Sequence, residues 1–61
     1  MTWIATRQIE ELYKLHICSL LDINKVIEAA KKLGMISLIN EITSNIDEYI
    51  TYITGRYKVE G

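Results

Sequence analysis

The stretch VIEAAKKLGMISLINEI, residues 26–42, is the most informative part of the sequence, because its helix-ending glycine lies between two apolar runs. Before Gly34, the apolar residues Val26, Ala30 and Leu33 recur at intervals of three or four, which is typical of a helix. Two lysines precede the glycine and suit the negative end of a helix dipole, and the glycine itself can adopt the left-handed conformation that ends a helix. The stretch therefore predicts a corner between two helices.

The chain before this stretch predicts a further helix and the start of the middle one. Asp22 is a good N-cap, so we expect the middle helix over about residues 23–33. The first helix is expected over about 6–20, with an apolar stripe that includes His16. Other apolar residues of this segment point away from the stripe, which is typical of a helix buried on more than one side. Whether the first two helices are continuous stays open, and a long helical hairpin is the alternative architecture.

After the corner, the sequence predicts one long helix over about 38–54. Ser37 is a suitable N-cap, apolar residues then follow at helical spacing, and Gly55 is placed where a left-handed C-terminal residue is expected. We therefore predict an all-α fold, a small helical bundle of two to three amphipathic helices in a single domain over 1–61. Residues 1–5 and 56–61 are expected as loose ends.

Length and composition favour self-association. A chain of 61 residues is near the lower limit for independent folding, and small proteins gain stability from disulfides, metals or oligomerisation. One cysteine allows no internal disulfide, and one histidine with no nearby second ligand predicts no metal site and no cofactor. Because 49% of the residues are hydrophobic, we expect a homodimer. The candidate interface residues are Leu15, Ile17, Cys18, Ile46, Tyr49 and Ile50.

Charge and hydropathy bear on partners and location. Seven basic and eight acidic residues give a net charge of −1, which predicts no strong attraction to nucleic acid or to an anionic membrane. No apolar run is long enough to span a bilayer, and no secretory signal is expected. A lone free cysteine fits a reducing compartment, so we expect a cytoplasmic protein. From the charge and the short apolar runs, we expect that it does not bind membranes.

The spacing of Ala30, Gly34 and the apolar residues around them resembles a helix-turn-helix unit, in which the helix from Ser37 would read DNA. That resemblance implies a transcriptional regulator. However, a reading helix uses Lys, Arg, Asn and Gln to contact phosphates and bases, and residues 34–55 contain no Lys or Arg. Nucleic-acid binding is therefore the alternative hypothesis and not the first.

Two family resemblances concern parts of the chain. The segment DINKVIEAAKKLGMISLINEI, residues 22–42, is similar to the paired helices in the second half of BTB/POZ domains, which implies a helical corner. The segment TSNID, residues 43–47, resembles the Ser-Gln-Glu-Leu-Asp signature on the second helix of small two-helix phosphatases of sporulation response regulators. Asp47 matches by identity, Thr43 and Ile46 are similar, and Ser44 and Asn45 replace Gln and Glu. This resemblance implies phospho-aspartate chemistry at Asp47 and is the second alternative.

The remaining candidates favour binding over catalysis. His16 and Cys18 lack the partners that activate a nucleophile, so we predict no catalytic residues and no enzyme activity. Trp, Tyr and Arg are enriched at the anchor points of interfaces. The predicted partner-binding residues are Trp3, Tyr52, Arg56 and Tyr57. We therefore expect a small non-enzymatic regulator, inhibitor or adaptor that acts as a helical homodimer and binds a protein partner.

Overall fold

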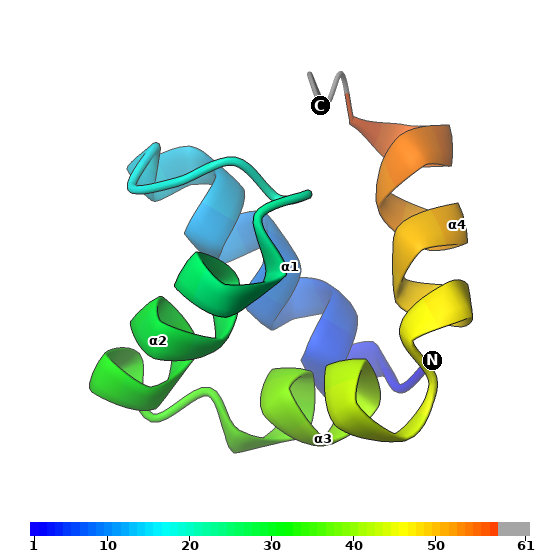
Figure 1. Cartoon of the computed structure of the whole chain (residues 1–61), viewed down its shortest axis with the longest axis horizontal. Coiled ribbons are helices and arrows are strands. Elements are labelled where there is room, and N and C mark those ends of the chain that lie inside the picture. Colours follow the sequence, from blue (N-terminus) through cyan, green and yellow to red (C-terminus); the bar gives the residue numbers. More distant parts are fainter. Residues whose placement is uncertain (58–61) are drawn as a thin grey trace.

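The computed structural model describes residues 1–57 as four helices arranged around one core. They are α1 (Trp3–Leu15), α2 (Ile23–Leu33), α3 (Ile36–Ser44) and α4 (Ile46–Arg56). Figure 1 shows α3 across the bottom of the molecule, with α2 and α4 rising on opposite sides. The short α3 contacts each of the other three helices. The predicted all-α fold class is confirmed.

The first helix begins earlier and ends earlier than the sequence predicts. The Thr2 hydroxyl accepts a hydrogen bond from the Ala5 amide at 3.2 Å, so the helix begins at Trp3 and residues 3–5 are not a loose end. It ends at Leu15 because His16 takes the left-handed conformation (φ 54°) and its amide bonds back to the Tyr13 carbonyl. An irregular segment, residues 16–22, separates α1 from α2, so the first two helices are not continuous.

The middle helix and the corner after it follow the sequence prediction. The Asp22 carboxylate accepts from the Lys25 amide at 3.4 Å and caps α2 at its start. At its end Gly34 has φ 72°; its amide bonds to the Lys31 carbonyl and the Met35 amide to the Ala30 carbonyl. This pair of bonds is the Schellman motif, which requires a left-handed residue. The helical corner implied by the BTB/POZ resemblance is therefore present.

The predicted helix over 38–54 is instead two helices, divided at Asn45. The backbone of this residue is not helical (φ −152°, ψ 76°), and its side-chain oxygen accepts from the Glu48 amide, which caps α4. Ser37 is not a cap, because α3 begins at Ile36 and its Leu38 amide donates to the Gln8 side chain at 2.9 Å. Gly55 lies inside the last turn of α4 and not past its end.

One apolar cluster holds the four helices together. Every helix contributes to it, and Leu20 of the 16–22 segment joins them. The members of this cluster, each with less than a tenth of its surface exposed, are Ile9, Leu12, Leu20, Val26, Ala29, Ala30, Met35, Leu38, Ile42, Tyr49 and Ile53. Across residues 1–57, no helix has the length and apolar character that a membrane span requires.

The two ends of the described chain also contact the bundle. The Met1 side chain is almost fully buried, and its amine forms an ion pair with the Glu48 carboxylate of α4. This ion pair raises the pKa of the amine. Arg56 is the last residue of α4, and Tyr57 is half-buried against the core, so these two residues are not loose. The rest of the predicted C-terminal end, residues 58–61, lies outside the described residues.

Candidate binding surfaces

Large apolar side chains remain on the surface of all four helices and of the 16–22 segment. Their exposed fractions run from 37% for Tyr13 to 70% for Trp3. Single exposed apolar residues are common in proteins, whereas groups of them on one face mark interaction sites. The exposed large apolar residues are Trp3, Ile4, Tyr13, Leu15, Ile17, Leu33, Ile36 and Ile46.

The first surface is a pocket of about 270 Å³ between α2 and the 16–22 segment, which we call the α2 groove. Its α2 residues lie at intervals of three, one, three and one, which places them on one side of the helix. Its lining combines four apolar side chains, counting the Cys18 thiol, with three charged ones. The groove is lined by Ile17, Cys18, Lys25, Glu28, Ala29, Lys32 and Leu33.

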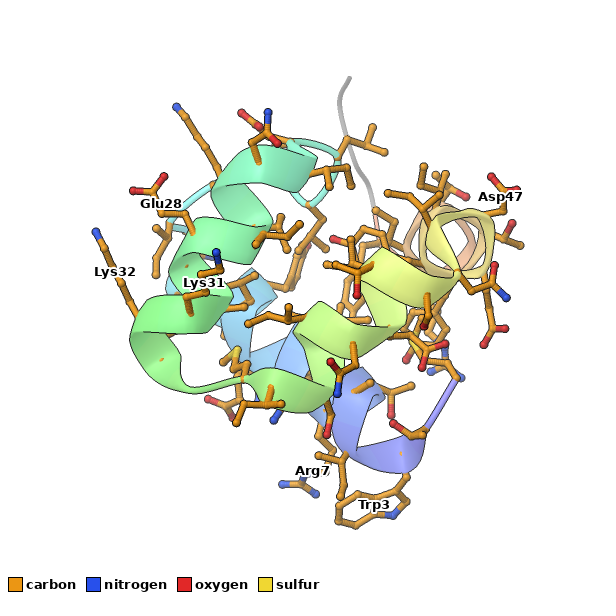
Figure 2. All side chains as sticks on the ribbon, turned by 60° about the horizontal axis from the view of Figure 1, so that its bottom comes forward. Trp3, Arg7, Glu28, Lys31, Lys32 and Asp47 are labelled. Atoms are coloured by element: carbon orange, nitrogen blue, oxygen red, sulfur yellow. The ribbon has the colours of Figure 1, made fainter. Side chains whose placement is uncertain are left out.

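The charged residues that line the α2 groove have a net positive charge. Lys25 and Lys32 lie against one acidic residue, Glu28, whereas Lys31 is on another side of α2. Glu28 and Lys32 form a long ion pair of 4.0 Å in which both side chains are more than two thirds exposed. Figure 2 shows Glu28 and Lys32 extending from α2 away from the bundle. Exposed pairs of this kind contribute little to stability, so these cations are accessible to a partner.

Cys18 also lines this groove and is half-buried. Burial is the largest of the effects that raise the pKa of its thiol, followed by the charge of Asp22. Because the thiolate is the nucleophilic form, a raised pKa makes the thiol less reactive near neutral pH. Cys18 therefore serves the groove as a small apolar side chain.

The second surface, which we call the α1 face, lies along the exposed side of α1 next to the start of α3. Ile4 and Leu15 are eleven residues apart, about three helical turns, and so lie on the same side of α1. Gln8, one turn after Ile4, bonds to the Leu38 amide, which brings this side of α1 beside the start of α3. Ile36, the first residue of α3, is 67% exposed. The α1 face comprises Ile4, Leu15 and Ile36.

The third surface is an aromatic group at the end of α4. The rings of Tyr13 and Tyr57 have centroids 4.5 Å apart, and Arg56 lies 5.1 Å from the centre of the Tyr52 ring. The structure therefore places three of the four predicted partner-binding residues together. Trp3, the fourth, lies at the other end of α1, where Arg7 approaches its ring to 5.4 Å (Figure 2). Tyr13 was not among the predicted partner-binding residues.

The predicted dimer residues do not form one surface. Tyr49 has no exposed surface and belongs to the core, so it offers nothing to a second copy in this fold. Ile50 packs against the core, while Ile46 is exposed at the start of α4. The other three predicted residues lie near the end of α1, with Leu15 on the α1 face and the remaining two in the α2 groove.

Ile4 and Ile36 are exposed apolar residues that sequence analysis missed. Both fell outside the predicted helices, since the first was expected to begin at residue 6 and the last at residue 38. The N-cap signal of Thr2 could have revealed the true start of the first helix.

The segment that resembles the phosphatase signature has a different structure from that signature. The TSNID segment is divided at Asn45 between α3 and α4, whereas the phosphatase signature lies on one helix. Asp47 is exposed and lines a shallow hollow with Asn45, Glu48 and Tyr52. Between residues 1 and 57, no group of three potential metal ligands comes together.

No family model, curated protein or solved structure matches the chain.

Proposed function

We propose that this chain is a small non-enzymatic protein-binding regulator, inhibitor or adaptor that acts as a homodimer in the cytoplasm. The observation that carries the proposal is the grouping of large apolar side chains on the surface, at the α1 face and in the α2 groove. Hiding apolar surface from water is the main source of affinity in protein association. Surfaces of this kind are typical of proteins that bind other proteins.

The α1 face is the surface best suited to a second copy. In an antiparallel pair of α1 helices related by a two-fold axis, Ile4 of one copy would meet Leu15 of the other, and the reverse contact follows by symmetry. The exposed charged residues of α1 balance, with Arg7 and Lys14 against two glutamates, so two copies can approach without net repulsion. Such pairing would bury apolar residues that the four-helix bundle leaves exposed.

Light scattering across protein concentrations tests the homodimer. We expect a mass of about twice the 7.1 kDa chain, and a thermal midpoint that rises with concentration because subunits that stabilise each other obey mass action. Leu15→Glu should shift the mass to that of one chain, since it places a charge in the interface. Lys14→Ala, its neighbour away from the α1 face, is the matched control and should leave the mass unchanged. A stable monomer with a concentration-independent midpoint would contradict the homodimer.

DNA binding is the second candidate, because α2, the turn at Gly34 and α3 succeed one another as in a helix-turn-helix. Two observations favour protein binding over it. The helix in the reading position, α3, carries no Lys or Arg, and it packs against all three other helices. In a gel-shift assay at low salt we expect no retention of random duplex DNA. Micromolar binding that weakens steeply with added salt would favour the second candidate instead, because that dependence reports phosphate contacts.

A further inference from the structure

We propose that the α2 groove binds an amphipathic helix that carries acidic residues beside its apolar stripe. The inference rests on the proposed protein-binding function and assigns the chemical class of the partner. It concerns a different surface from the α1 face, so self-association and partner binding can be tested separately.

The dimensions of the groove fit a helix. Its residues on α2 run from Lys25 to Leu33, a rise of about 12 Å or two helical turns. Its apolar lining comes from Leu33 and the small Ala29 on α2, and from Ile17 and Cys18 of the 16–22 segment. A helix that binds an apolar groove presents side chains at intervals of three, four and seven residues, which span the same distance. Ala29 lets the backbone of the incoming helix approach closely.

Charge indicates which kind of helix would bind. Lys25 and Lys32 line the groove about two helical turns apart on α2. Within residues 1–57, Lys25 forms no ion pair, and Lys32 has only its long, exposed pair with Glu28, the one carboxylate that lines the groove. An apolar ligand with acidic flanks would therefore pair with Lys25 and compete with Glu28 for Lys32. Complementary charge at an edge mainly increases the rate and selectivity of association.

The same charges disfavour a second copy of this chain in the groove. Two α2 grooves packed together about a two-fold axis would bring four lysines together against two glutamates. The acidic start of α4, with the exposed Ile46 beside Asp47, is a different surface from the groove. Its insertion into the groove of another copy would be a heterologous contact, which builds open chains unless it closes into a ring. Binding of a separate acidic partner requires neither the pairing of two basic grooves nor an open chain of copies.

Binding of defined peptides tests the proposal. The probe is a fluorescently labelled, helix-forming peptide of about 15 residues with leucines at three- and four-residue intervals and flanking glutamates. Its counterpart has lysine at every glutamate position. In anisotropy titrations of the wild-type protein, we expect saturable binding of the acidic peptide, at least tenfold tighter than that of the basic one. Added salt should reduce the difference, since the charges lie at an exposed edge.

Variants locate the site. Lys25→Glu should weaken binding of the acidic peptide at least tenfold and strengthen that of the basic peptide. Leu33→Glu should weaken binding of both peptides, because it places a charge on the apolar surface; this position is half-exposed, so the fold tolerates the change. Arg7→Glu makes the same charge change on α1, well away from the groove in Figure 2, and should leave both affinities within twofold. Circular dichroism of each variant checks that it is folded.

Several outcomes would overturn the proposal. They are equal affinity for the two peptides, no binding of either by folded wild-type protein, and an affinity that Lys25→Glu does not change. A mass that falls on Leu33→Glu would assign the groove to a second copy instead. Light scattering on the same samples separates the two proposals. A monomer that binds the acidic peptide would support the helix-binding groove and contradict the homodimer. A dimer that binds neither peptide would support the homodimer and contradict the helix-binding groove.

Discussion

The Tyr49 hydroxyl donates a hydrogen bond of 2.6 Å to the carbonyl of Leu20, across 29 residues of sequence. Tyr49 is the largest fully buried side chain, and it reaches from α4 to the irregular segment 16–22. A buried carbonyl outside regular secondary structure needs such a partner, because leaving it unpaired costs free energy. This bond therefore holds the segment whose residues line the α2 groove.

Tyr49→Phe should lower the free energy of unfolding by about 1–2 kcal/mol, because it keeps the buried ring but leaves the Leu20 carbonyl without its donor. Chemical denaturation followed by circular dichroism measures the change. Tyr52→Phe is the control: it removes a hydroxyl of α4 that makes no hydrogen bond within residues 1–57, and should change stability by less than about 0.5 kcal/mol. Equal losses in the two variants would contradict this account.

Stability should fall at alkaline pH. Burial raises the pKa of Tyr49 well above its ordinary value near 10.0, with the Cys18 charge as a smaller cause. Above pH about 10 the unfolded chain loses this proton while the folded chain keeps it. The contribution is therefore fully present below pH about 10 and is lost as the pH rises toward the folded-state pKa, by up to about 1.4 kcal/mol per pH unit. Tyr57, whose pKa burial also raises, adds a loss of the same sign.

The comparison of wild type with Tyr49→Phe isolates that contribution. Denaturant melts from pH about 8 to 11 should show a steeper loss of stability in the wild type, because the phenylalanine variant has one buried titrating group fewer. Parallel pH profiles would show that Tyr49 does not carry the effect.

Gln8→Ala should destabilise the start of α3 by about 1 kcal/mol, since the Leu38 amide would lose its acceptor from the neighbouring helix. Gln8→Glu is the matched variant, because it keeps a side-chain oxygen at the same place and adds a negative charge near the positive end of α3. We expect it to equal or exceed the wild type in thermal melts. A glutamate variant as unstable as the alanine variant would argue against the capping role.

Replacement by alanine should change the free energy of unfolding in opposite directions at Gly34, which ends α2, and at Gly55, which lies in the last turn of α4. Gly34 has φ +72°, so Gly34→Ala forces a left-handed alanine and should cost about 1–2 kcal/mol. Gly55 lies within α4 with open space where a Cβ would stand, so Gly55→Ala should raise stability by about 0.5–1 kcal/mol. Denaturation of both variants under one set of conditions provides the comparison. Destabilisation by Gly55→Ala would show that α4 ends before this residue.

His16→Gly should stabilise the protein by roughly 1 kcal/mol, because His16 holds the left-handed conformation (φ 54°) that only glycine adopts without strain. The exposed ring loses only its contact with Tyr13, whose ring centroid is 5.9 Å away. His16→Asn should lie between the two, since asparagine tolerates this conformation better than most residues. A lower thermal midpoint for the glycine variant would mean that the ring contact outweighs the backbone strain.

The spacing of apolar residues did not predict the break between α3 and α4 at Asn45. Ile42, Ile46 and Tyr49 keep helical intervals across the break, so the pattern predicts one helix. A local signal was nevertheless present, because Asn45 and Glu48 have the spacing of a capping box. In the structure the Asn45 oxygen accepts from the Glu48 amide and its amide group donates to the Glu48 carboxylate. Capping signals should therefore be given weight even inside a continuous apolar stripe.

The sequence alone determined the features that depend on neighbouring residues. The bounds of α2, its Asp22 cap and the left-handed Gly34 all follow from hydrogen bonds that span at most five residues. Such bonds depend on the local sequence alone. The helical corner at Gly34 could therefore be predicted from the residues that form it.

Which apolar residues are buried and which stay exposed depends on how the helices pack against one another. Tyr49, predicted at a dimer interface, is in the core, whereas Leu33 and Ile36 are exposed beside the corner. Helical spacing assigns residues to a side of one helix but not to the neighbour that covers it. That assignment depends on contacts between distant segments, such as the Gln8 bond to the Leu38 amide across 30 residues, which orient the helices relative to one another.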